Sequence, residues 1–200
     1  MVRILITGGA CAGKTEIIEA IKNNYQNKEY NVFVLNEIPT QLIANGVTFK
    51  KIGKMKFIEL VIKIYLELDN NYNSFIANNS QNIIVYDGTP LDMLKFISKK
   101  EFDKIAAKYN TSFDKIINCY DKIIFLETIA KKYPQFYTLE NNRARLNDVN
   151  MAVKRNDILA GYYESANHIY IEGCLVFTEK KDKVLKIIDE TLEKITIKNE

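Results

Sequence analysis

Residues 6–18 read "ITGGACAGKTEII" and follow the apolar run Val2–Ile6 directly. Gly8, Gly13, Lys14 and Thr15 match the phosphate-loop pattern G-x-x-x-x-G-K-[ST] in full. The dinucleotide fingerprint G-x-G-x-x-G does not fit, because Ala10 stands at its second glycine position. Small residues let successive backbone N–H groups converge on an anion, and a helix N-terminus adds a positive dipole. The pattern therefore predicts a loop for nucleoside triphosphate phosphates, formed by Gly8, Gly9, Ala10, Cys11, Ala12, Gly13, Lys14 and Thr15.

Three residues of this loop have distinct expected roles. The Lys14 ammonium can reach the β and γ phosphates as a point charge, and the Thr15 hydroxyl can ligate Mg²⁺. Cys11 is interpreted as a small side chain at a variable position of the loop rather than as a nucleophile. The expected cofactors are therefore ATP and Mg²⁺.

Acidic residues follow three of the predicted strands, namely Glu37, Asp87 and Glu127. In a parallel α/β sheet, ligands bind beyond the carboxyl ends of the strands. Asp87 follows four apolar residues, the form of an acid that orients Mg²⁺, and it is predicted to do so here. Glu37 is predicted to act as the general base for an attacking hydroxyl, although a helix-capping role before Pro39 is an open alternative. Glu127 is the weakest of the three candidates, since the fourth strand of such sheets often ends in a polar loop.

Arginine is scarce in the chain, and Arg143, Arg145 and Arg155 all fall in one polar, helical stretch. A planar guanidinium stabilises the charge that develops during phosphoryl transfer, and a segment that closes over the phosphates excludes water. Arg143 and Arg145 are therefore predicted to belong to a lid around residues 138–160. Solvated charges on a helix surface are the alternative.

The elements that would position these residues alternate between strands and helices along the chain. Strands are expected at Val2–Thr7, Asn31–Leu35, Asn82–Asp87, Lys122–Leu126 and His168–Glu172. The intervening helices are expected at Lys14–Lys22, Lys54–Asn79, Leu91–Ser98, Glu101–Tyr109, Ser112–Tyr120, Asn142–Asn167 and Lys180–Lys194. This alternation predicts an α/β fold, a parallel sheet with helices on both faces, in one domain over residues 1–200.

The bulk composition excludes several classes of protein. With 47% hydrophobic and 26% charged residues among 200, the chain is typical of a globular protein. Its apolar runs are too short to span a bilayer, and it begins directly with a strand-like run, so no membrane association and no secretory leader are expected. Three cysteines without CxxC spacing indicate reduced thiols and a cytoplasmic location. The net charge of +3 suits a protein that handles small anions but is too mild for an extended nucleic-acid surface.

Five segments together resemble the small AAA-type ATPase family of nucleoside- and nucleotide-kinase-like P-loop proteins, which includes nicotinamide riboside kinase domains. They read "ITGGACAGKT", "NEIPTQLIANG", "YDGTPLDML", "YDKIIFLE" and "ENNRARLNDV", and the resemblance runs from Val2 to Phe177. It implies a five-stranded parallel sheet in the order 2-3-1-4-5, binding of ATP and Mg²⁺, an acceptor site from Glu37 onward, and lid arginines at Arg143 and Arg145. Kinases of this group usually carry an arginine after the strand-3 acid, where this chain has Gly88.

Three functions fit these residues. The leading hypothesis is an ATP-dependent kinase that transfers phosphate to a small molecule, a nucleoside or nucleotide, whose base could stack on Phe49, Phe57 or Tyr65 unless those rings are plain core. The second is an ATPase or nucleotide-dependent switch with a protein partner, which Gly88 favours. The third is a polynucleotide kinase that uses the lysines of Lys50–Lys56, although nucleic acid is the less expected partner. The sequence does not indicate an oligomeric state.

Overall fold

A computed structural model describes the chain apart from residues 77, 80, 138–147, 165, 167 and 200 and the side chains of residues 196–199. Its centre is a parallel sheet of five strands in the order β2-β3-β1-β4-β5, the order that the family resemblance implied. The inner strands are buried on both faces, which explains their continuous apolar runs. The strands are β1 Val2–Gly8, β2 Asn31–Leu35, β3 Asn82–Asp87, β4 Lys122–Leu126 and β5 His168–Ile171.

The strand register brings the loop and the acids of the sequence to one edge of the sheet. Ile6 of β1 pairs with Asp87 of β3, and Leu35 of β2 pairs with Tyr86. The end of β1, where the glycine-rich loop begins, therefore lies beside the end of β3 and close to the end of β2.

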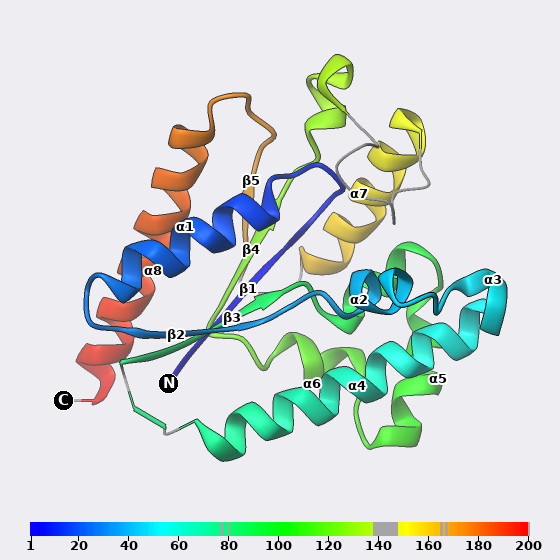
Figure 1. Cartoon of the computed structure of the whole chain (residues 1–200), viewed down its shortest axis with the longest axis horizontal. Coiled ribbons are helices and arrows are strands. Elements are labelled where there is room, and N and C mark those ends of the chain that lie inside the picture. The colour runs from blue at the N-terminus through cyan, green and yellow to red at the C-terminus, as the bar shows by residue number, and fades with distance from the viewer. Residues whose placement is uncertain (77, 80, 138–147, 165, 167, 200) are drawn as a thin grey trace.

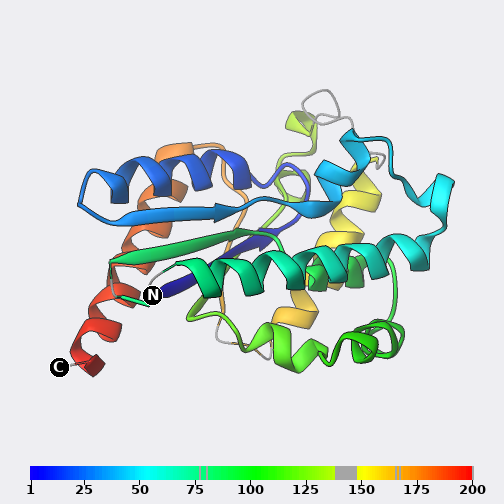
Figure 2. The same cartoon turned by 60° about the horizontal axis from the view of Figure 1, so that its bottom comes forward.

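Helices cover both faces of the sheet, as Figures 1 and 2 show. One face packs α1 and α8 onto the sheet through an aliphatic cluster that includes Ile17, Ile21 and Val184. The opposite face carries α4, α5, α6 and α7 around a larger core. The α-helices are α1 Lys14–Gln26, α2 Ile38–Ala44, α3 Phe49–Ile52, α4 Lys54–Phe75, α5 Lys99–Ala106, α6 Phe113–Ile117, α7 Val149–Tyr163 and α8 Phe177–Asn199. Short 3₁₀ turns are η1 Pro90–Lys95, η2 Ala107–Tyr109, η3 Ile129–Lys131 and η4 Pro134–Phe136.

Some element predictions need correction. The helix predicted over Lys54–Asn79 ends at Phe75, and the short helices α2 and α3 after β2 were not predicted. Residues 90–95 form a 3₁₀ helix, with Pro90 in its first turn and with Thr89 and Asp92 as reciprocal caps. The helix predicted from Asn142 is described only over Val149–Tyr163, since residues 138–147 lie outside the described part. None of the described helices is long and apolar enough to cross a bilayer.

Candidate functional site

The glycine-rich loop turns from β1 into α1 through three residues with positive φ, Gly8 (140°), Cys11 (53°) and Gly13 (80°). A Cβ atom on Gly8 would lie 1.9 Å from the carbonyl oxygen of Leu126 in β4, so only glycine fits against that strand. Gly13 is the left-handed N-cap of α1, which leaves the first N–H groups of the helix open toward the loop. The local sequence thus builds an anion cradle at a helix N-terminus.

Lys14 reaches back over this loop. Its ammonium donates to the carbonyl of Gly9 at 2.9 Å and, more weakly, to that of Gly8 at 3.4 Å. The charge therefore already lies at the mouth of the cradle, where phosphate oxygens could replace the two carbonyls.

Side chains from distant parts of the chain brace the loop from outside. The buried ammonium of Lys180 donates to the Ala12 carbonyl at 2.9 Å, and the Thr128 hydroxyl donates to the Ala10 carbonyl at 2.5 Å. Asn156 of α7 accepts from the Thr128 N–H at 3.0 Å. Burial lowers the pKa of Lys180, the cost of placing a cation beneath the loop. The sequence did not predict these supporting hydrogen bonds, because they join distant segments and no local pattern indicates them.

Asp87 ends β3 beside the loop. Its Oδ1 atom is buried and, among the described residues, has no hydrogen-bond partner. Burial raises the pKa of Asp87 to about 6; the Lys14 charge opposes this increase, and the charges of Glu37 and Asp92 add to it. A buried carboxylate oxygen that accepts no hydrogen bond is well suited to binding a cation.

Asp87 shares a cavity of about 370 Å³ with Thr15. The carboxylate and the hydroxyl are hard oxygen donors, and Mg²⁺ prefers one or two carboxylates completed by phosphates and water. Among the described residues no group of three acidic, histidine or cysteine side chains could form a metal cage. The Thr15–Asp87 pair therefore fits Mg²⁺ held together with bound phosphates.

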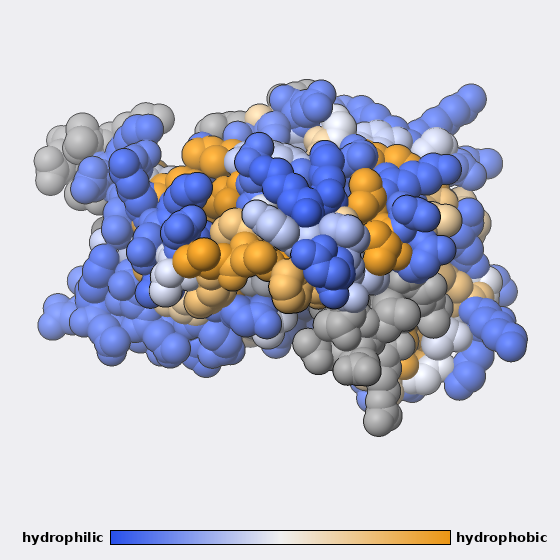
Figure 3. All heavy atoms as spheres, turned by 90° about the horizontal axis from the view of Figure 1, so that it is seen from above, coloured by the Kyte–Doolittle hydropathy of each residue, from blue (hydrophilic) through white to orange (hydrophobic). Residues whose placement is uncertain are grey.

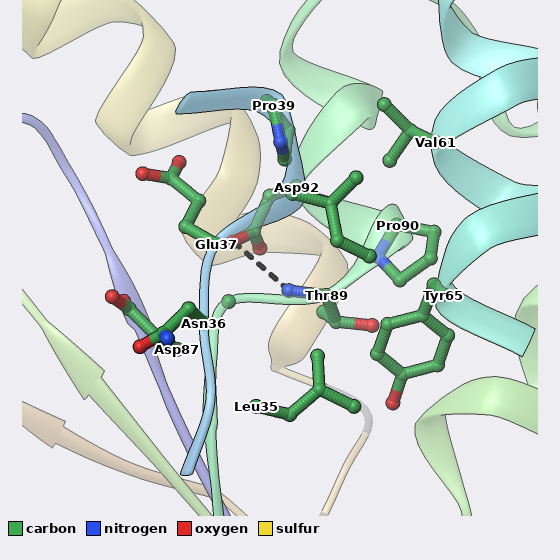
Figure 4. A pocket seen from close by; sticks show the side chains of 12 residues that line it. Leu35, Asn36, Glu37, Pro39, Val61, Tyr65, Asp87, Thr89, Pro90 and Asp92 are labelled. Carbon is green, nitrogen blue, oxygen red and sulfur yellow. Dashed lines mark hydrogen bonds between the residues drawn. The ribbon is translucent and has the colours of Figure 1, made fainter. Parts of the chain in front are cut away.

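Glu37 occupies the N-cap position of α2, but its side chain makes no capping hydrogen bond. Instead its carboxylate accepts from the Thr40 hydroxyl at 2.6 Å. Figure 4 shows the carboxyl groups of Glu37 and Asp87 pointing to the same side, away from Val61 and Tyr65. Asp87 and Asn36 line both the small pocket beside Glu37 and the cavity that contains Thr15, so the two spaces adjoin.

Glu127, the third acid at a strand end, forms hydrogen bonds that connect neighbouring segments of the fold. The carboxylate is buried and accepts from the Tyr170 hydroxyl at 2.6 Å and the Gly173 N–H at 2.8 Å, with Lys131 at 3.3 Å. These bonds tie the end of β4 to β5 and to the chain that follows it, and they satisfy the carboxylate fully.

Asp92 is an acid of this region that sequence reasoning missed. It is buried, and its Oδ1 accepts from the Thr7 and Tyr163 hydroxyls at 2.7 and 2.8 Å. A Cβ atom on Gly88, which has φ +73°, would lie 2.8 Å from Asp92 Oδ2. The signal that could have found Asp92 is the Thr89-x-x-Asp92 capping spacing.

The aromatic candidates separate into core and cavity. Phe57 is fully buried, and Tyr65 is buried with its hydroxyl 2.5 Å from that of Tyr120. Phe49 packs edge-on against Phe57 and Phe96 and lines a cavity on the α7 side of η1. Phe57 is therefore plain core, whereas Tyr65 lines the small pocket beside Glu37 (Figure 4) and Phe49 lines the cavity, where a ligand could contact it.

The predicted lid arginines, Arg143 and Arg145, lie outside the described residues. Arg155 is placed on α7, where its guanidinium lies 4.6 Å from the centre of the Phe96 ring. The structure thus brings together the loop, Thr15, Asp87 and Glu37.

A parallel sheet in this order, with a phosphate loop between β1 and α1, defines the chain as a P-loop protein of the nucleoside- and nucleotide-kinase-like class. The model of the AAA domain family matches residues 3–173, and the chain belongs to that family.

Solved structures of deoxyadenosine kinase from M. mycoides share the fold. The complex with the products dCMP and a flexible dCDP superposes with a TM-score of 0.63 at 16% identity, over 94% of this chain and 100% of that one. The dATP and dCTP complexes give TM-scores of 0.61 and 0.59 at 16% and 15% identity over the same shares. No curated protein matches the sequence.

Proposed function

We propose that the protein is an ATP- and Mg²⁺-dependent kinase that transfers the γ-phosphate to a hydroxyl group of a small nucleoside- or nucleotide-like acceptor. One observation carries the proposal: the Glu37 pocket and the Thr15 cavity adjoin at Asp87, beside the phosphate loop. A base and a cation-binding acid therefore face one space at the end where phosphate would be presented. The fold that the chain shares with a deoxyadenosine kinase supports this assignment.

Each residue has a role in this proposal. The amides of the loop from Gly8 to Gly13 and the Lys14 ammonium hold the β and γ phosphates, and Thr15 with Asp87 holds Mg²⁺. Bound Mg²⁺ supplies neutralisation of phosphate charge. Glu37 accepts the proton of the acceptor hydroxyl as its oxygen bonds to the γ-phosphorus. The bond from that phosphorus to the β–γ bridging oxygen breaks, and ADP leaves.

The nucleotide base has an apolar surface close to the loop. The start of α8 lies against the loop, because Lys180 of α8 bonds to Ala12. The residues just before this helix expose the apolar side chains of Leu175 and Val176, at 49% each. The upper face of the molecule exposes apolar side chains among hydrophilic ones (Figure 3). We assign the base of ATP to this surface, and Arg143 and Arg145 to a lid within one domain. The part of the predicted lid segment 138–160 that belongs to α7 is not assigned to the lid, because Ala152, Asn156 and Leu159 are buried there.

The proposal is tested with labelled ATP, Mg²⁺ and a panel of nucleosides, nucleotides and 5′-hydroxyl oligonucleotides. Label in a nucleoside or nucleotide is the expected result. Acceptor-independent release of phosphate would instead support the ATPase or switch, which the absence of an arginine at Gly88 favours. Label only in oligonucleotides would support a polynucleotide kinase, and no turnover with any acceptor would refute the kinase.

A further inference from the structure

A second, larger cavity of about 410 Å³ lies on the α7 side of η1. Its size is within the range of small-molecule sites. Half of its described lining residues are cationic, the other half are apolar, and none is acidic. The lining consists of Phe49, Lys54, Lys95, Phe96, Met151, Lys154, Arg155 and Ile158.

Three of the four cationic residues contact one residue, Phe96. The Lys95 ammonium lies 5.5 Å and the Arg155 guanidinium 4.6 Å from the centre of its ring, and the Lys54 ammonium donates to its carbonyl at 3.2 Å. Cations over a ring face gain from its quadrupole. The ring therefore holds two positive charges near each other at one wall of the cavity.

Gathering these charges has an electrostatic cost. Burial lowers the pKa of both Lys95 and Arg155, and for Lys95 the charges of Lys14 and Arg155 lower it further. Asp92 and Glu37, the acids that attract Lys95, line the pocket on the other side of η1 rather than this cavity. An anion in the cavity would stabilise the charges of Lys95 and Arg155, which burial disfavours.

Lys95 links the cationic cavity to the Glu37 site, because it lines the cavity while its charge interacts with those of Glu37 and Lys14. Pro90, at the start of this 3₁₀ helix, lines the Glu37 pocket, and Lys95, at its end, lines the cationic cavity. The five steps from Pro90 to Lys95 along the 3₁₀ helix rise about 10 Å at about 2 Å each, close to the length of a nucleoside. One molecule could therefore place its hydroxyl at Glu37 and its other end among the cations.

We propose that the acceptor carries an anionic group, a carboxylate or a phosphate, at the end remote from the reacting hydroxyl. Lys95, Lys154 and Arg155 bind this group. Phe49 and Phe96 contact the ring system that bears it. This inference rests on the proposed function, because the molecule in the cavity is an acceptor only if the protein is a kinase. The triphosphate is held elsewhere, since no residue of the phosphate loop lines this cavity.

The test is calorimetric binding of two matched pairs of probes: adenosine against N6-carboxymethyladenosine, and uridine against 5-carboxymethyluridine. Each pair adds a carboxylate at the edge of the base, the end remote from the 5′-hydroxyl. A non-hydrolysable ATP analogue with Mg²⁺ is present at saturation, so that the phosphate loop cannot bind the probe. Lys154→Met, at an exposed position of α7, and Lys95→Met are compared with Lys186→Met, which removes an exposed lysine of α8.

We expect at least one anionic probe to bind about tenfold or more tightly than its neutral partner. Lys154→Met and Lys95→Met should reduce that preference severalfold, and Lys186→Met should leave it unchanged. Equal binding within both pairs, no binding of either anionic probe, or a preference that both variants retain would overturn the proposal. Phosphate transfer to neutral nucleosides alone would overturn this inference and leave the kinase standing. Anion-selective binding without transfer to any acceptor would support the anion site and refute the kinase.

Discussion

We expect Asp87→Asn to abolish phosphate transfer and at the same time to stabilise the fold at neutral pH. The carboxylate is mostly buried, its Oδ1 lacks a partner among the described residues, and burial raises its pKa from the model-peptide value of 3.8 to about 6. The ionised form is therefore less favourable in the folded protein than in the unfolded chain. A neutral amide of the same shape removes that penalty.

The magnitude follows from the pKa difference. Between pH 3.8 and 6 the folded state binds more protons at Asp87 than the unfolded state, so stability falls as pH rises through this window. About two pH units at about 1.36 kcal/mol each give a penalty of about 3 kcal/mol above pH 7. Since Asp87 is partly exposed and the amide itself needs hydrogen bonds, we expect Asp87→Asn to gain about 1–2 kcal/mol at pH 7.5.

The assay is urea denaturation of both proteins at pH 7.5 and pH 4.5. The gain should fall to less than half at pH 4.5, where the folded wild type is largely protonated at this site. Asp182→Asn, whose carboxylate is 71% exposed on α8, is the matched control and should change stability by less than about 0.5 kcal/mol at either pH. A loss of stability at pH 7.5, or an equal gain at both pH values, would refute the electrostatic reasoning.

Three further substitutions probe the loop. Lys14→Ala should lower phosphate transfer at least about 100-fold while the melting temperature stays within about 2 °C, since the hydrogen bonds of Lys14 to described residues go only to loop carbonyls. Transfer at the wild-type rate would exclude the phosphate loop from the reaction. Gly9→Ala should destabilise the fold by about 2 kcal/mol, because the new Cβ would lie 2.6 Å from Asn156 Oδ1; an unchanged urea midpoint would contradict this packing. Lys180→Met leaves the Ala12 carbonyl without its donor and should weaken ATP binding about tenfold, whereas wild-type affinity in a titration would show that the brace is dispensable.

Much of this site could be predicted from the sequence, because its first components are local. The phosphate loop is a contiguous pattern, and Glu37 and Asp87 were found by their position after apolar runs. The position directly after a strand indicates a shared site because the strands are parallel and their carboxyl ends meet at one edge of the sheet. Glu127 occupies an equivalent place after β4 and was the weakest of the three candidates. Its carboxylate is saturated by Tyr170 and Gly173, so the position alone does not establish a site.

The remaining components depend on contacts between distant segments. Lys180 lies 168 residues from the Ala12 carbonyl that it binds, and neither residue type nor local spacing signals the pair. The short helices α2 and α3 have too few residues to show an apolar period, and η1 is set by Pro90 and its caps rather than by a helical repeat. Such features follow from the packed fold, in which tertiary contacts override weak local preferences.

Gly88 shows how the packing around Asp87 restricts the chemistry of the site. At its φ of +73° a side chain would be strained, and a Cβ there would lie 2.8 Å from Asp92 Oδ2, so that something would have to shift. The Thr7 and Tyr163 hydroxyls restrict such a shift, because both bind Asp92 Oδ1 in the core. An arginine at this position would therefore strain the packing around Asp92. Lys95 is a cation close to this site, and its charge interacts with those of Glu37 and Lys14. In the proposed kinase, positive charge for the acceptor would therefore come from Lys95, at the end of η1, rather than from position 88 just before η1 begins. This is why we propose that the acceptor is bound through its remote end.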